Sequence, residues 1–99
     1  MKEVSLMPKT HAMFFKMLSS RTRIEILKIL RANEGLTVDE LSSRLHVTPT
    51  TVSRHLQLLR MQEMVTFRQD AQSRYYRVEE KEIVKRIGHF LEYLDIPRA

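Results

Sequence analysis

The sequence predicts one mainly α domain with a β-hairpin, in the order helix, helix, two closely joined helices, hairpin, helix. Three observations support this prediction. Apolar residues recur at helical spacing along most of the chain, two helix starts carry complete capping signals, and β-branched and aromatic residues are concentrated in 65–78. The 99 residues suffice for one hydrophobic core but not for two, so we expect a single domain over 1–99.

Apolar stripes indicate the first two helices, at about 9–18 and 20–33. In the second helix, Ser20 stands where it can cap the N-terminus, and Gly35 supplies a left-handed residue just past the end. The stripe of the first helix consists of Met13, Phe14, Met17 and Leu18. The residues of the second helix that we expect to face inward are Ile24, Leu27 and Leu30, flanked by Ile26 and Ile29.

The third helix is predicted at about 37–45 from its start signals. Thr37 can cap the helix while the side chain of Glu40 reaches back to the cap, which makes a capping box. Leu36 and Leu41 stand at the two ends of a hydrophobic staple around that cap. So complete a set of signals predicts a well-defined helix start at this point.

The fourth helix is predicted at about 49–63, with Thr48 as its N-cap and Pro49 at its first helical position. Only 45–47 remain to connect it to the preceding helix. Two short helices joined by so tight a connection are typical of a helix-turn-helix. The residues of the fourth helix that we expect to face the core are Val52, Leu56 and Leu59.

A hairpin and a last helix complete the chain. Polar residues at 69–72 interrupt the strand-forming segment 65–78, which indicates a hairpin. The last helix is predicted at about 80–94, before Pro97. Gly88 in its middle costs about 1 kcal/mol relative to Ala, so it marks either the close approach of another backbone or a tolerated defect. The order of elements is that of a winged helix-turn-helix with an additional helix at each end.

The polar face of the fourth helix suits DNA. Short hydroxyls allow close approach to base edges, Arg can bind guanine with two hydrogen bonds, and Gln can pair with adenine. The helix N-terminus can seat a phosphate, and wing side chains can contact the backbone or the minor groove. The alternative for each surface is an ordinary solvated face. The predicted DNA-binding residues are Thr48, Pro49, Thr50, Thr51, Ser53, Arg54 and Gln57 of the helix and Arg68, Gln72 and Arg74 of the wing.

Two neighbouring residues of the fourth helix are kept outside this set. His55 leans toward the core side of the helix, where a packed, hydrogen-bonded histidine explains it at least as well as a DNA contact does. Arg60 either contacts phosphate or faces solvent, and we assign it no role.

Composition excludes several classes of protein. The chain has no cysteine, so it forms no disulfide and has no thiolate ligand or nucleophile. No apolar run approaches the roughly 20 residues that span a bilayer, and the first residues lack a secretory signal, so we expect a cytoplasmic protein with no membrane partner. No phosphate loop, nucleophile elbow or metalloprotease motif is present, so we expect no enzyme. The net charge of +5, to which 79–99 contribute −1, favours a polyanionic partner.

Three segments resemble the ArsR/SmtB family of winged-helix repressors. Residues 18–27 resemble the opening of the family's second helix. Residues 41–59, centred on the sequence TTVSRHL at 50–56, resemble its recognition-helix motif, and the sequence RYYRV at 74–78 is similar to its second wing strand. The resemblance covers nearly the whole chain.

The resemblance implies a homodimer that binds an inverted-repeat operator with its recognition helices in successive major grooves. It also implies that the first and last helices pair across the two-fold axis, and that an effector, unknown here, relieves repression. The residues expected at the dimer interface are Met13, Phe14, Met17, Ile87, Phe90, Leu91 and Leu94.

The family's metal ligands are missing. Arsenic- and cadmium-type members carry a Cys-x-Cys pair where this chain has Thr-Val-Asp at 37–39, and a wing glycine is replaced by Ala71. The positions of the zinc ligands are occupied by Glu80, Glu82, Tyr93 and Ile96, with no imidazole among them, so we expect no metal and no cofactor. The alternative is a metal-responsive derepressor with a non-standard site formed across the dimer by His11, His89 and Glu92.

The main competing hypothesis is a winged helix that serves as a protein–protein interaction module. The fold does not decide between the two, because function depends on the site and not on the scaffold. An interaction module would more often expose apolar anchors where this chain places Thr50, Ser53, Arg54 and Gln57. The polar face therefore favours DNA.

Overall fold

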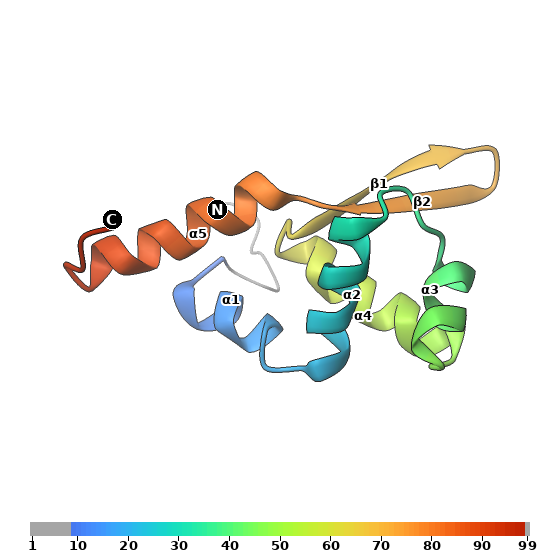
Figure 1. The fold of residues 1–99 in the computed structure, drawn as a ribbon, viewed down its shortest axis with the longest axis horizontal. Coiled ribbons are helices and arrows are strands. Elements are labelled where there is room, and N and C mark those ends of the chain that lie inside the picture. The colour runs from blue at the N-terminus through green and yellow to red at the C-terminus, as the bar shows by residue number, and fades with distance from the viewer. Residues whose placement is uncertain (1–8, 99) are drawn as a thin grey trace, which may run out of the picture.

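The computed structural model describes residues 9–98, so the expectation drawn from the first few residues lies outside it. Within this range, five helices and a two-stranded antiparallel hairpin follow one another in the predicted order, which confirms the fold class (Figure 1). The elements are α1 (His11–Met17), α2 (Arg21–Ala32), α3 (Val38–Leu45), α4 (Pro49–Met61), β1 (Val65–Asp70), β2 (Ser73–Val78) and α5 (Glu80–Tyr93).

Three helices form the centre of the molecule and the other elements extend from it. In Figure 1, α2, α3 and α4 pack together, the hairpin reaches out to one side, and α5 runs away from the hairpin to the opposite side with α1 beside it. Aromatic rings join α1 to α5, with ring centroids 4.6 Å apart for Phe15 and Phe90 and 5.5 Å apart for His11 and Phe90. The wing and the α1–α5 pair thus lie at opposite ends of the domain.

The three predicted helix caps are present. The hydroxyl oxygens of Ser20 and Thr48 each accept a hydrogen bond from the backbone N–H three residues further on, at 3.2 and 3.3 Å. Thr37 accepts from the N–H of Glu40 at 3.2 Å, and a Glu40 carboxylate oxygen accepts from the N–H of Thr37 at 2.9 Å. This reciprocal pair is the predicted capping box. Each cap satisfies a backbone donor that has no partner within its helix.

Left-handed residues follow the helix ends. His46, at φ 56°, ends α3 and makes the tight turn to α4, and Glu63, at φ 61°, follows the C-cap of α4. Because of that turn α4 ends at Met61, two residues before the predicted limit. Gly35 has a φ of 86°, as expected of a left-handed residue, although the C-cap of α2 itself is Asn33.

The core lies between the helices and the base of the hairpin, and it confirms the predicted inner stripe of α4. In α2 the prediction for Ile24 was wrong, because this side chain is 45% exposed whereas Ile26 is fully buried. Residues two apart on a helix face different sides, and Arg23 takes the inward position of the stripe that continues to Ile26 and Leu30. The buried apolar residues are Phe14, Met17, Ile26, Leu30, Leu36, Leu41, Val52, Leu56, Leu59, Met64, Val65 and Tyr76.

The hairpin is more regular than the sequence indicated. Its strands pair up to Asp70 opposite Ser73, so the connection shrinks to two residues, and Ala71 adopts a φ of 57° where a glycine would be unstrained. The base of the hairpin is tied to the start of α3, because the Tyr76 N–H donates to the carbonyl of Leu36 at 2.8 Å and the Leu36 N–H donates back at 3.2 Å. The wing is therefore anchored to the helix-turn-helix.

The neighbour of Gly88 in α5 is a side chain rather than another backbone. A Cβ at this position would clash with an Nη atom of Arg98, whose guanidinium folds back over the helix. Arg98 also donates to a Glu92 carboxylate oxygen at 3.1 Å. The helix itself ends at Tyr93, ahead of Pro97, as predicted.

Candidate nucleic-acid interface

One face of α4 is buried and the opposite face is open. Val52, Leu56 and Leu59 are each 0% exposed, which fixes the rotation of the helix about its axis. The predicted base-contacting residues then point to solvent and line a wide hollow with Val38 and Pro49. These exposed residues are Thr50, Ser53, Arg54 and Gln57. The structure thus places the predicted polar face where a ligand can reach it.

The N-terminus of α4 offers fewer free donors than the sequence suggested. Pro49 has no N–H, and the N–H of Thr51 is already bound by the Thr48 cap at 3.3 Å. The Thr48 hydroxyl additionally donates to the Thr51 hydroxyl at 3.0 Å. Of the first three residues of the helix, only Thr50 keeps a backbone N–H without a partner among residues 9–98.

His55 lies behind the polar face and is held by an arginine. Its Nδ1 is 3.1 Å from an Nη atom of Arg23, whose Nε also donates to the carbonyl of Met17 at 2.9 Å. Burial, then the positive charges of Arg23 and Arg54, lower the pKa of His55, so its neutral form is favoured and accepts the hydrogen bond from Arg23. Burial also lowers the pKa of Arg23. Of the two alternatives for His55, a DNA contact or a packed and hydrogen-bonded histidine, the structure shows the second.

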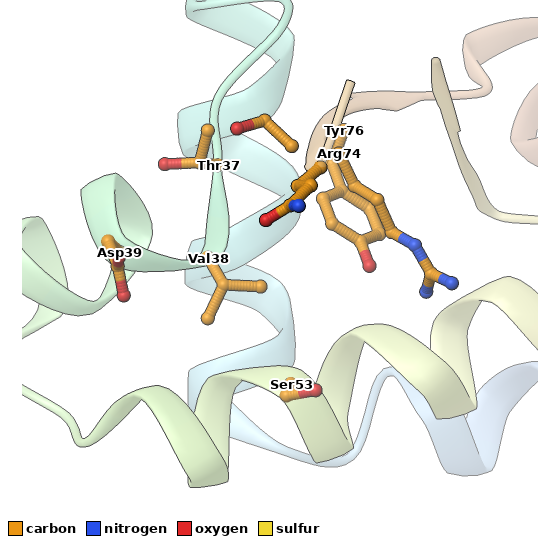
Figure 2. Close-up of a pocket in the computed structure, with 8 residues that line it drawn as sticks. Thr37, Val38, Asp39, Ser53, Arg74 and Tyr76 are labelled. Carbon is orange, nitrogen blue, oxygen red and sulfur yellow. The ribbon is translucent and has the colours of Figure 1, made fainter. Parts of the chain in front are cut away.

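The wing brings two of its three predicted residues next to α4. Gln72 and Arg74 line a hollow of about 400 Å³ together with Ser53 of α4. Figure 2 shows this hollow, with Thr37, Val38 and Asp39 on one side, Arg74 and Tyr76 on the other and Ser53 on the helix below. Arg68 alternates with these residues along the hairpin and lies on the opposite face, where its guanidinium stacks over Tyr75 at 4.7 Å.

A cluster at the junction of α4 and the wing, formed by Arg60, Phe67 and Arg74, was not predicted. The guanidinium carbons of Arg60 and Arg74 lie 4.9 and 4.4 Å from the centroid of the Phe67 ring. Phe67 also contacts the ring of Tyr76, with centroids 5.4 Å apart. The sequence separates these residues by up to fourteen positions, so only the hairpin register brings them together.

Apolar side chains are exposed on α1 and α5, at the end of the molecule away from the wing. Ile87 and Leu94, which were predicted to lie at the dimer interface, are 40% and 46% exposed, and Phe15 of α1, which packs against Phe90 of α5, is 38% exposed. Phe14 and Met17, by contrast, are 1% and 2% exposed within the single chain. These two pack in the chain's own core and leave almost no surface for a partner, so we take them out of the proposed interface. Met13, Phe90 and Leu91 are half-buried and stay in it.

A buried arginine connects α5 to the end of α4. Arg86 is 8% exposed, and its guanidinium donates to the backbone carbonyl of Gln62 at 2.7 Å and to the side-chain oxygen of Gln62 at 2.9 Å. It also lies over the ring of Phe14 at 5.0 Å. Sequence reasoning missed this role, because an arginine in a helix normally predicts a solvated position.

Two of the three predicted metal-site candidates, His11 and His89, line one hollow of about 70 Å³ within the chain, whereas Glu92 does not line it. His11 packs against the rings of Phe90 and Tyr93, and Glu92 is bound by Arg98. Over residues 9–98, no group of three His, Cys, Asp or Glu side chains is placed to hold a metal ion. Two other acidic residues of α5 have cationic partners, since Glu80 binds Arg31 at 2.8 Å and Glu82 binds Lys85 at 3.2 Å. Within the same range, no helix has the length and apolar character needed to cross a bilayer.

Comparison with known sequences identifies related regulators. The model of the family described as "Bacterial regulatory protein, arsR family" matches residues 20–66, from the cap of α2 into β1. The transcriptional activator HlyU of Vibrio cholerae is 38% identical over 68 residues, which are 69% of this chain and 62% of that protein. The match therefore spans less than two thirds of that relative's length. The family is thus described as one of regulatory proteins and this relative as a transcriptional activator, and neither description is that of an enzyme.

Solved structures show the same fold. HlyU from Vibrio cholerae is 33% identical with a TM-score of 0.67, covering 83% of this chain and 88% of that one. NolR from Sinorhizobium fredii is 28% identical with a TM-score of 0.69, covering 98% and 100%. A homodimeric winged helix-turn-helix DNA-binding domain from Mycobacterium bovis is 25% identical with a TM-score of 0.67, covering 85% and 77%. The architecture inferred from the element order is thus shared along most of the chain.

Proposed function

This chain belongs to the ArsR family of bacterial regulatory proteins, and from that membership we propose that it binds duplex DNA in the major groove and regulates transcription. The observation that carries the proposal is the exposed polar face of α4. Its hydroxyl, guanidinium and amide groups match the hydrogen-bonding edges of bases, while the opposite face of the helix is locked into the core. A cytoplasmic location follows from this proposal, because the operator is there.

We propose that the active form is a homodimer built on α1 and α5. The exposed Phe15, Ile87 and Leu94 support this, because together they form an apolar face that a second copy would cover. A two-fold axis at that end leaves both copies of α4 free to enter major grooves about 34 Å apart, which requires an inverted-repeat operator. Occupation of such a site near a promoter would repress transcription. The relative HlyU is named an activator, so a reporter gene is used to measure whether this protein represses or activates transcription.

The experiment is selection of bound duplexes from random DNA, followed by titration at several salt concentrations. We expect two symmetric half-sites and an affinity that falls steeply with salt, because phosphate contacts release counterions. Absence of any binding at low salt would instead support the protein–protein interaction module. Repeating the selection with added divalent metals tests the metal-responsive alternative with His11, His89 and Glu92.

Arg54 provides the test of base recognition. Arg54→Ala should weaken operator binding by roughly 1–3 kcal/mol and relax the preference at one position in each half-site. Arg44→Ala removes an exposed arginine from the last turn of α3 and serves as the control. Equal losses for all operator variants would remove Arg54 from the base-contacting set.

A further inference from the structure

The junction between α4 and the wing holds two arginines on one aromatic ring. Arg60 comes from α4 and Arg74 from β2, and each guanidinium lies within 5 Å of the centroid of Phe67 on β1. Phe67 is half-buried against the hydrophobic core and contacts Tyr76, so the ring itself is held in place. Stacking on the ring therefore restricts the positions of the two guanidinium groups, which flexible arginine side chains would otherwise leave mobile.

The two arginines are not neutralised by the protein. Neither side chain makes a hydrogen bond or an ion pair with any residue in 9–98. The other two wing arginines differ, because Arg68 lies 3.9 Å from an Asp70 carboxylate oxygen and Arg77 lies 3.3 Å from one of Glu79. Stacking occupies the face of a guanidinium but leaves the N–H groups around its edge free to donate.

The location of this cluster continues the proposed DNA-binding surface. Arg60 follows Ser53 and Gln57 at i+7 and i+3, so it extends the same polar stripe by one more turn. Arg74 lines the hollow that it shares with Ser53, as Figure 2 shows. A DNA strand that leaves the groove beside α4 and passes under the wing would run across both guanidinium groups.

We propose that Arg60 and Arg74, stacked on Phe67, form a phosphate clamp that grips the DNA backbone where the recognition helix meets the wing. This inference rests on the proposed DNA binding and assigns a role to Arg60 that the sequence did not. Arg60 and Arg74 donate to phosphate oxygens, and Phe67 acts as a positioning residue that contacts no DNA. Planar guanidinium groups suit phosphate because they donate two parallel hydrogen bonds.

The test is a double-mutant cycle on the selected operator, measured by fluorescence anisotropy at several salt concentrations. Arg60→Ala should weaken binding roughly tenfold on every operator variant and lower the slope of log affinity against log salt by about one. Phe67→Leu keeps an apolar side chain in the core but loses the stacking surface, and it should weaken binding about threefold to tenfold. Because Phe67 acts through the arginines, Phe67→Leu should have almost no further effect in an Arg60→Ala, Arg74→Ala background.

Arg77→Ala is the matched control, because it removes an equal charge from a wing arginine that already has acidic partners, and it should leave the salt slope unchanged. If Phe67→Leu does not fold, as judged by circular dichroism, Arg60→Lys replaces it, since a lysine keeps the charge but loses the planar stack.

Wild-type protein that binds no duplex would refute the proposed function. Wild-type binding with unchanged affinity and slope in Arg60→Ala would refute the clamp alone, and losses that depend on base sequence would refute the assignment to phosphate.

Discussion

Arg86 is a buried arginine, so its removal should lower the stability of the protein far more than the removal of a solvated arginine would. Its guanidinium makes two hydrogen bonds to Gln62, the C-cap of α4, and lies over Phe14 of α1, so it links three helices. A hydrogen bond from a charged group contributes about 1.5–3 kcal/mol. Removing the guanidinium also removes the cost of taking its charge out of water, which offsets part of the loss of the two bonds. Arg86→Ala should therefore lower the free energy of unfolding by about 3 kcal/mol.

The assay is urea denaturation followed by circular dichroism at a fixed protomer concentration, because unfolding of a dimer depends on concentration. Arg86→Lys should recover only part of the loss, since one ammonium group cannot reproduce the planar fork. Arg31→Ala is the control, because its ion pair with Glu80 of α5 is exposed on both sides and should contribute no more than about 1 kcal/mol. A loss below about 1 kcal/mol for Arg86→Ala, with an unchanged m value, would refute the argument that these two bonds hold α4 to α5.

Three further predictions follow from single features. Thr37→Ala removes the capping box of α3 and should cost about 1 kcal/mol in urea denaturation, with Ser43→Ala on the exposed side of the same helix as the control. Because the pKa of His55 is lowered in the folded protein, the unfolded chain binds this proton more readily, so the free energy of unfolding should fall as the pH drops below about 6.5. His55→Gln should flatten this dependence of stability on pH. Parallel dependences for the wild type and the variant would contradict the hydrogen bond from Arg23. Ending the chain after Val78 should give monomers with much weaker operator binding in sedimentation and anisotropy, and an intact dimer would contradict the role proposed for α5.

The features determined by local sequence were largely predictable. The Ser20, Thr37 and Thr48 caps, the inner stripe of α4 and the hairpin each depend on residues only a few positions apart, and the structure confirms them. Capping and amphipathic periodicity act within a turn or two of helix, so the sequence contains all the information they need. The exposure of the α4 polar face then followed from the burial of its opposite side.

The remaining features depend on contacts between distant segments. Ile24 was predicted to face inward because an apolar residue in an apolar stripe usually does, but it is 45% exposed. The inward position is taken by Arg23, which contacts His55 thirty-two positions away. Phe14 and Met17 belong to the apolar stripe that was predicted to lie at the dimer interface, but both side chains are buried in the chain's own core.

The sequence by itself determined the order of elements, where the helices begin and which face of α4 is polar, because these follow from short-range hydrogen bonding and hydrophobic periodicity. Only the tertiary structure decided that Arg86 is buried, that Arg60 and Arg74 share one ring and that a side chain covers Gly88. An arginine has the same local sequence signature whether it is solvated or stacked, since the difference lies in what the rest of the fold brings against it.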